Sequence, residues 1–215
     1  VQMDPGEEET ADIYVLAVPH QAALDLLPSQ VVEQEPMFAS VRRLRVSPIT
    51  GVHFWFDRDV MAEPFLTAID TTTQWIFNKS RLYGRPGGYL QLVISASYDL
   101  MPRSRQEIVD LCRRELRDLL PATREANLVK ATVVKEAAAT FSPEPGSDRW
   151  RPPQQTPLPN LYLAGDWTRT GWPATMEGAV RSGYLAAEAI LAAAGAPRKL
   201  VRPDLPPRGL ARWLA

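Results

Sequence analysis

The apolar and polar residues follow three different patterns along the chain, and the first is confined to its beginning. Residues 12–18 form a short apolar run with β-branched side chains, which is typical of a buried strand in a parallel sheet. Pro19 ends the run, and residues 20–27 then carry apolar side chains at helical spacing. A strand, a proline turn and a short helix together predict the edge of an α/β nucleotide-binding sheet.

Alternating patterns dominate the middle of the chain and predict strands with one buried side. Every second residue is apolar in residues 51–56 and again in residues 89–97. The side chains that share the buried sides are Val52, Phe54, Phe56, Leu90, Leu92, Ile94 and Ala96. His53 and Trp55 fall on the opposite side of the first strand. Residues 128–135 are rich in valine and predict a third strand.

One segment of this middle region has helical periodicity instead. Within residues 104–120 the apolar positions at helical spacing are Ile108, Leu111, Cys112, Leu116, Leu119 and Leu120. Ser104 fits the N-cap, and Glu107 three residues later would complete a capping box. Strands with a helix laid across them predict an α+β module that is covered on one face.

The last third of the chain opens with a proline-rich connection, residues 142–159. Residues 160–166 then form a short apolar strand that ends in Gly-Asp, and a helix follows from near Ala174. The residues that share one stripe of this helix are Met176, Ala179, Val180, Gly183, Ala187, Ile190 and Leu191. The tail, residues 196–215, is rich in proline and arginine and is expected on the surface.

Composition narrows the class of protein. A chain of 215 residues is long enough for one large domain or two small ones, and its formal net charge of −1 gives no basic field that would indicate a nucleic acid partner. Cys112 is the only cysteine, so no internal disulfide forms and a reducing, cytoplasmic compartment is favoured. No apolar run approaches the roughly 20 residues that span a bilayer. The acidic start is unlike a signal peptide, and the opening on Val1, leading straight into a strand, predicts a cut through a larger protein.

The clearest candidate for a ligand-binding site is Gly165 and Asp166. They lie at the carboxyl end of a predicted strand, where α/β sheets bind ligands. Gly165 permits the close approach of a backbone or a cofactor, and the Asp166 carboxylate can accept hydrogen bonds from sugar-like hydroxyls. The N-terminus of the following helix suits a pyrophosphate, or the edge of a flavin that becomes negative on reduction. The same strand, turn and helix also make a common α/β connection, in which Asp166 merely caps a turn.

The run LYLAGDWTRTGWPATMEGAVRSGYLAAEAI closely resembles the C-terminal FAD motif of the amine oxidase and phytoene desaturase superfamily, and ADIYVLAVP resembles a strand of its FAD domain. The resemblance implies that Asp166 bonds the ribityl or diphosphate part of FAD and that the backbone of residues 175–177 faces the flavin O2. The cofactor residues that it implies are Gly165, Asp166, Trp167, Ala174, Thr175, Met176, Glu177 and Ala179. The segments SPITGVHFWFDRDV, WIFN, VISAS and ATFSPEPGSDRWRP resemble the hydroxysqualene dehydroxylase branch, the squalene-associated FAD-dependent desaturases of hopanoid pathways.

The chain departs from that family in one respect. The family carries an N-terminal G-x-G-x-x-G fingerprint that holds the ADP half of FAD, and none of the twelve glycines forms it. The resemblance therefore implies one wall of an FAD site and most of a substrate domain, with a missing N-terminal Rossmann segment as the natural partner. The chain alone is expected to bind FAD poorly.

The remaining candidates allow more than one interpretation. The aromatic residues fit either a core or an apolar pocket for an isoprenoid chain, and the pocket residues would be Trp55, Phe56, Trp75 and Phe77. His20 and His53 lack carboxylate or cysteine partners at ligand spacing, so no metal site is expected, and no residue is named as catalytic. A mobile tail or a peripheral membrane contact would each explain Arg198, Lys199, Arg202, Arg208, Arg212 and Trp213.

The sequence thus predicts an α/β fold, a partial FAD-binding (Rossmann-like) domain with an inserted α+β substrate domain. The FAD-domain pieces are placed at 1–35 and 141–195, the substrate domain at 36–140 and the tail at 196–215. The implied activity of the intact enzyme is FAD-dependent reductive dehydroxylation of hydroxysqualene, in the cytoplasm or at the inner membrane. The alternatives are a carotenoid desaturase or amine oxidase relative, and a non-catalytic fragment or half of a split enzyme.

Overall fold

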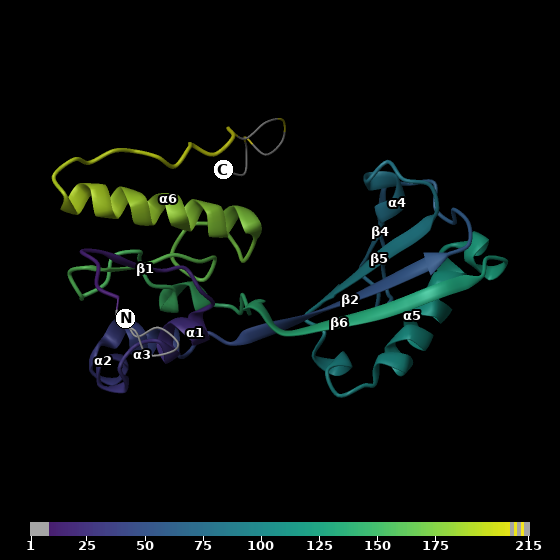
Figure 1. Ribbon diagram of the computed structural model, residues 1–215, viewed down its shortest axis with the longest axis horizontal. Helices are drawn as coiled ribbons and strands as arrows, with labels where there is room; N and C mark the ends of the chain where they lie inside the picture. Colours follow the sequence, from purple (N-terminus) through teal and green to yellow (C-terminus); the bar gives the residue numbers. More distant parts are fainter. Residues whose placement is uncertain (1–8, 207–208, 210–211, 213–215) are drawn as a thin grey trace. The chain divides into compact units, whose positions relative to one another are not determined.

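The computed structural model describes residues 9–206 together with residues 209 and 212. The chain forms two compact units (Figure 1): unit 1 combines the residues up to 45 with those from 141 onward, and unit 2 is residues 46–140. The sequence pattern places the first boundary near residue 36. The structure instead assigns helix α3 (Pro36–Val41) to unit 1, because Phe38 and Val41 are buried in the core of that unit.

Unit 2 is built on a five-stranded sheet with the strand order β3, β4, β5, β2, β6. The bounds of the strands are β2 Val46–Phe56, β3 Phe65–Thr67, β4 Trp75–Asn78, β5 Gly88–Ser95 and β6 Leu128–Phe141. The pairs β2 with β5, β5 with β4 and β4 with β3 are antiparallel. Helix α4 (Lys79–Leu82) joins β4 to β5, and the short 3-10 turns η1 (Tyr98–Leu100) and η2 (Pro121–Arg124) flank helix α5 (Arg105–Leu119).

The core of unit 2 lies between one face of this sheet and α5 (Figure 1). The predicted alternation is confirmed, because every second residue is buried from Thr50 to Phe56 in β2 and along β5. The side chains that meet in this core include Val52, Phe54, Phe56, Leu90, Leu92, Ile94, Ile108, Cys112 and Leu116. The prediction for Ala96 is wrong: β5 ends at Ser95, and Ala96 is exposed with a φ of 50° in the turn that follows.

Helix α5 begins as the sequence predicts. The Ser104 hydroxyl accepts a hydrogen bond from the Glu107 backbone N–H at 3.2 Å, and the Glu107 carboxylate accepts one from the Ser104 N–H at 2.7 Å. This reciprocal pair satisfies two of the donors that every helix leaves unpaired at its N-terminus.

Unit 1 holds a two-stranded parallel sheet of β1 (Tyr14–Leu16) and β7 (Leu161–Leu163). Helices α1 (His20–Asp25) and α2 (Ser29–Gln34), with α3, pack beside it, and the 3-10 turn η3 (Ser147–Trp150) lies in the connection that leads to β7. The buried apolar residues of this core are Ala23, Val32, Phe38, Val41, Leu44, Phe141, Leu161, Leu163 and Trp167. The parallel pairing agrees with the sequence interpretation of both strands.

Strand β1 is less buried than its apolar sequence predicts. Val15 is 45% exposed, and only β7 pairs with this strand among the described elements. In contrast, all three residues of β7 are buried, and Tyr162 forms an isolated bridge with Gln155 on its other side. The prediction of a buried strand therefore holds for β7 and fails for β1.

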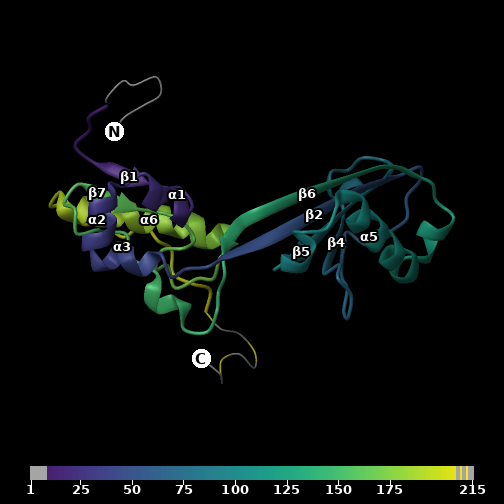
Figure 2. The same ribbon diagram turned by 90° about the horizontal axis from the view of Figure 1, so that it is seen from below.

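Helix α6 (Met176–Ala193) packs against β7 through small residues (Figure 2). Gly178, Ser182 and Ala186 form its buried side. The apolar stripe that the sequence marks lies on another side, because Met176 is 87% exposed and Val180 is 58% exposed. The helix thus buries its small residues and leaves larger apolar ones in the open.

The first part of the tail lies against α6. The Glu188 carboxylate accepts hydrogen bonds from the backbone N–H groups of Leu200 and Val201 at 2.6 and 2.9 Å. Of the cationic and aromatic tail residues considered for a membrane contact, Arg208 and Trp213 lie outside the described residues. Among the described residues, no helix is long and apolar enough to cross a membrane.

Candidate functional site

Gly165, two residues after the end of β7, has a conformation that suits glycine. Its φ is 144°, and a Cβ atom at this position would lie 2.3 Å from Nε1 of Trp167. That indole nitrogen donates to the carbonyl oxygen of Val18 at 2.9 Å, and the Gly165 N–H donates to the Ser182 hydroxyl at 2.6 Å. Gly165 therefore allows the end of β7 to lie against both Trp167 and helix α6.

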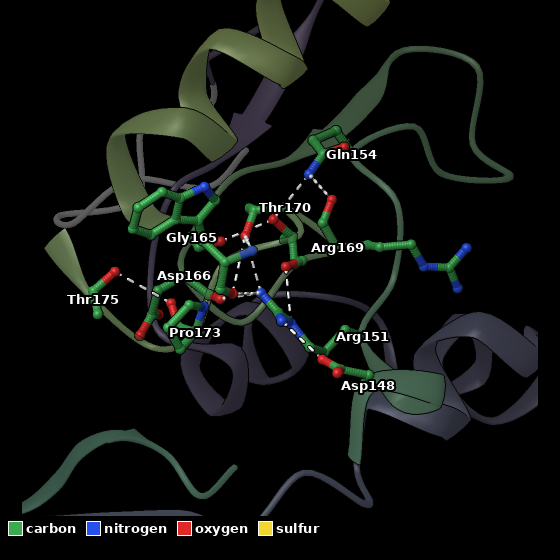
Figure 3. A network of polar contacts seen from close by, with 11 residues as sticks. Asp148, Arg151, Gln154, Gly165, Asp166, Arg169, Thr170, Pro173 and Thr175 are labelled. Carbon is green, nitrogen blue, oxygen red and sulfur yellow. Dashed lines mark hydrogen bonds and ion pairs between the residues drawn. The ribbon is translucent and has the colours of Figure 1, made fainter. Parts of the chain in front are cut away.

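Arg151 holds the loop between β7 and α6 in place (Figure 3). Its side chain is buried, and its Nη2 donates to the carbonyl oxygens of Asp166 and Trp172 at 2.9 and 2.8 Å. Its Nε donates to the carbonyl oxygen of Thr168 at 3.0 Å, and its Nη1 pairs with the Asp148 carboxylate at 2.9 Å. A single guanidinium thus fixes carbonyl groups at both ends of the loop.

Two further side chains complete this network. The Gln154 amide donates to the Thr168 hydroxyl at 3.0 Å and to the Arg169 carbonyl at 3.2 Å. The Thr170 hydroxyl lies 3.0 Å from Nη2 of Arg151 and 3.1 Å from the backbone nitrogen of Trp172. The loop is therefore held mainly by hydrogen bonds from the Arg151 and Gln154 side chains to its backbone carbonyls.

Helix α6 opens next to this loop. Thr175 is its N-cap and accepts a hydrogen bond from the Gly178 N–H at 3.1 Å. A Cβ atom on Gly178 would lie 2.7 Å from the carbonyl oxygen of Pro173, so glycine permits this close turn. Within the described part of the chain, the N–H groups of Met176 and Glu177 have no protein partner, and both residues are exposed. These free donors and the positive end of the helix dipole can bind an anionic or carbonyl oxygen.

The residues predicted at the cofactor lie along this loop and the first turn of α6. Thr175, Met176, Glu177 and Ala179 are exposed, and Gly165, Asp166 and Ala174 are partly buried. The exception is Trp167, which is buried in the core of unit 1 and bonded through its indole to Val18. Only the backbone of Trp167 could therefore face a cofactor.

The sequence interpretation misses Arg151, and it considers His20 only as a metal ligand. His20 is buried, and its Nε2 donates to the carbonyl oxygen of Leu44 at 3.1 Å. Burial lowers the pKa of His20, opposed by this hydrogen bond and by the charge of Asp166, so the ring is neutral at physiological pH. Both residues bind backbone carbonyls, and no sequence motif marks such a role.

A second candidate surface lies on the sheet of unit 2, on the face that α5 does not cover. It carries Trp55, Phe65, Trp75, Phe77 and Tyr89, which we call the aromatic face. The rings of Trp55 and Tyr89 are stacked with centroids 4.6 Å apart, and those of Trp75 and Phe77 with centroids 5.8 Å apart. Trp75 is 39% exposed and Phe65 is 53% exposed, so this is an open apolar surface. Such a surface suits a hydrocarbon ligand.

Three of the four residues predicted for the substrate pocket lie on the aromatic face. Phe56 does not, and placing it with the others was wrong. Its side chain is buried in the core beneath α5, because neighbouring residues of a strand point to opposite faces.

Comparison with known proteins gives a consistent picture. The family model described as flavin containing amine oxidoreductase matches residues 1–191. The chain is 33% identical over 199 residues to 15-cis-phytoene desaturase of Synechococcus elongatus, covering 87% of this chain and 42% of that protein. It is 34% identical over 194 residues to hydroxysqualene dehydroxylase of Sinorhizobium fredii, covering 88% of this chain and 42% of that protein.

Solved structures share the fold at low sequence identity. A putative protoporphyrinogen oxidase from Exiguobacterium sp. superposes with a TM-score of 0.66 at 14% identity, covering 89% of this chain and 43% of that one. A UDP-galactopyranose mutase gives a TM-score of 0.63 at 15% identity, covering 90% of this chain and 43% of that one. The chain therefore spans less than half the length of the relatives and structures that it matches.

Proposed function

The chain belongs to the family of flavin containing amine oxidoreductases, and we propose that the whole protein uses FAD to transform an apolar isoprenoid. Membership of the family implies FAD as the cofactor. The observation that carries the proposal is the β7–α6 connection, where the partly buried Asp166 accompanies the free N–H groups of Met176 and Glu177.

The residues of this connection fit a flavin cofactor. Asp166 offers a carboxylate for a ribityl hydroxyl or a water that bridges to the diphosphate. The N–H groups of Met176 and Glu177 offer donors at the positive end of α6 to a flavin carbonyl oxygen. Ala174 presents only a methyl group beside these donors, so a flat ring could approach the backbone there.

The reaction that we propose is reductive dehydroxylation of hydroxysqualene. It replaces a C–O bond by a C–H bond, consumes two electrons and two protons, and releases water. FAD, when bound and reduced, supplies the electrons. The chain's own residues bind and orient the cofactor and the substrate. The N-terminus of α6 stabilises negative charge on the flavin, and the aromatic face binds the hydrocarbon and excludes water.

Desaturation of a carotenoid precursor is the second candidate, because phytoene desaturases match this chain as well as the dehydroxylase does. The two reactions run in opposite redox directions. The whole protein, loaded with FAD, should therefore be given hydroxysqualene under reducing conditions and phytoene with an electron acceptor, and the products separated by chromatography. Squalene formation alone supports the proposal, and phytoene desaturation alone overturns it.

Asp166 provides a test of the cofactor site that is independent of substrate. In the whole protein, Asp166→Ala should lower the flavin content per protein more than it lowers the melting temperature of the apoprotein. It removes a charge-assisted hydrogen bond typically worth about 1.5–3 kcal/mol. Asp25→Ala removes an exposed carboxylate of the same unit and serves as the control. Full flavin content with a much lower melting temperature would make Asp166 a structural cap instead.

The partner and location follow from the same proposal. The chain spans 42% of the dehydroxylase it matches, and we propose that an N-terminal Rossmann segment of the whole protein binds the ADP half of FAD. The 215-residue chain alone should then gain little stability from added FAD. We also propose a peripheral contact with the inner membrane through the cationic tail, and sedimentation with anionic vesicles would test it.

A further inference from the structure

The aromatic face of unit 2 carries a polar pair among its rings. Nδ1 of His53 lies 2.9 Å from the hydroxyl oxygen of Tyr89, and the two rings are 5.9 Å apart. Tyr89 is itself stacked on Trp55, and the His53 ring is stacked beside Trp55 at 6.0 Å. An imidazole and a phenol are thus fixed by aromatic contacts on a surface otherwise suited to hydrocarbon.

The other nitrogen of His53 faces an opening left by a glycine. A Cβ atom on Gly51 would lie 3.6 Å from Nε2 of His53, so Nε2 borders the space that a larger side chain at position 51 would fill. The strand register places Gly51 opposite Val93 and Val93 opposite Trp75. Within unit 2, all of which the structure describes, Nε2 has no hydrogen-bond partner. We call this space the Gly51 gap.

The protonation of the pair makes it a match for a neutral hydroxyl. Burial, with the nearby charge of Lys79, lowers the pKa of His53, and burial raises the pKa of Tyr89. At physiological pH the pair therefore consists of a neutral imidazole and a protonated phenol. If Tyr89 donates to Nδ1, then Nε2 carries a proton and donates into the Gly51 gap; in the other tautomer Nε2 accepts there. A hydroxyl group can satisfy Nε2 in either state, whereas a hydrocarbon cannot.

We propose that His53, positioned by Tyr89, binds the hydroxyl group of an isoprenoid alcohol in the Gly51 gap while the aromatic face binds its hydrocarbon chain. The proposal rests on the function proposed above and names the residues that would select an alcohol over a hydrocarbon. A site built to pair with a hydroxyl discriminates against the analogue that lacks it, because the polar groups of the site are then left without a partner. Gln91, directly opposite His53 on β5, is the nearest other polar residue in the register.

The test compares two ligands of matched length in the FAD-loaded whole protein. Hydroxysqualene and squalene are titrated in detergent micelles, and binding is followed by the change in flavin absorbance. His53→Leu and Tyr89→Phe should each weaken hydroxysqualene binding by about tenfold and leave squalene binding within about twofold. His53→Gln keeps a side-chain amide near the position of Nε2 and should restore part of the affinity for the alcohol. Gly51→Ala should weaken alcohol binding without unfolding the sheet, because its Cβ would make only an ordinary van der Waals contact.

The controls separate this proposal from the one on which it rests. Tyr98→Phe removes a tyrosine hydroxyl that bonds the Val46 carbonyl at 2.8 Å, away from the aromatic face, and should change neither affinity. Trp75→Ala should weaken both ligands. If Trp75→Ala changes neither, the aromatic face does not bind the substrate and the hydroxyl proposal is overturned, whereas the proposed reaction is judged separately by squalene formation. If Trp75→Ala weakens both ligands while the His53 and Tyr89 variants affect both equally or neither, only the hydroxyl proposal is overturned.

Discussion

Nη2 of Arg151 lies 2.9 Å from the carbonyl oxygen of Asp166 and also bonds the carbonyl of Trp172, so one nitrogen ties the two ends of the β7–α6 loop (Figure 3). Arg151 bonds the backbone carbonyl of Asp166 and not its side-chain carboxylate. Arg151 therefore acts on the candidate cofactor site indirectly, by fixing where the backbone of Asp166 lies.

Replacing Arg151 should lower the free energy of unfolding by more than the loss of one ion pair would. Arg151→Met leaves the carbonyl oxygens of Asp166 and Thr168 without their donor and the Trp172 carbonyl with only the Thr170 hydroxyl at 3.3 Å, and each buried unpaired group costs about 1–3 kcal/mol. We expect the free energy of unfolding to fall by about 3 kcal/mol in urea titration. Arg169→Met is the matched control: Arg169 is exposed on the same loop, and this change should alter stability by less than about 0.5 kcal/mol. Equal effects of the two would contradict the assigned role.

Two glycines should respond to alanine in opposite ways. Gly165→Ala would place a Cβ 2.3 Å from the Trp167 indole at a φ of 144°, so the variant should be strongly destabilised and its Trp167 fluorescence altered. Gly183→Ala meets nothing within 4 Å inside α6 and should stabilise by about 0.5–1 kcal/mol. Thermal melting of both variants checks the prediction, and a tolerated Gly165→Ala would refute the close packing described at the end of β7.

The buried thiol of Cys112 should make stability depend on alkaline pH. Burial raises the pKa of Cys112 to about 11, whereas the thiol ionises near 9 when the chain is unfolded. The folded state thus loses stability as pH rises from about 9 towards 11, by about 1.4 kcal/mol per unit, because only the unfolded state releases the proton. Cys112→Ala should remove this part of the pH dependence in urea titrations. Native protein should also resist thiol reagents, and rapid labelling before unfolding would show that the core of unit 2 opens.

The open side of α6 should drive association of the 215-residue chain. Met176 and Val180 are exposed on it, and exposed apolar patches of this kind bind other surfaces. The double variant Met176→Glu, Val180→Lys should shift the chain towards monomer in size-exclusion chromatography with light scattering. Ala192→Lys, near the exposed end of the same helix, is the control and should leave association unchanged. A wild-type chain that stays monomeric at high concentration would contradict the prediction that the exposed side of α6 causes association.

Local patterns explain what could be predicted from the sequence. Alternation over β2 and β5 marked the core of unit 2, and the capping box marked the start of α5, because both depend on residues close together in the chain. The same alternation separates Trp55 from Phe56, so grouping the two in one pocket ignored the period of a strand.

The errors and omissions depend on contacts between distant residues. The buried side of α6 was missed because small residues pack most closely, and hydrophobicity alone pointed to Met176 and Val180. Arg151 was missed because its partners are carbonyl groups some 15 to 21 positions further along the chain, and every residue type carries a carbonyl. The pairing of His53 with Tyr89 likewise depends on the strand register, which a single strand's pattern does not contain.

The hydrogen bond from Ser142 N–H to the carbonyl oxygen of Arg45, at 2.7 Å, joins the two points at which the chain leaves and re-enters unit 1. All of unit 2 lies between these residues, and its first and last strands, β2 and β6, are neighbours in one sheet. Because its two ends lie next to each other, unit 2 can be lengthened, shortened or replaced as a whole without separating the two segments of unit 1. Recombination at these two points would let a lineage exchange unit 2 while the core of unit 1 stays unchanged.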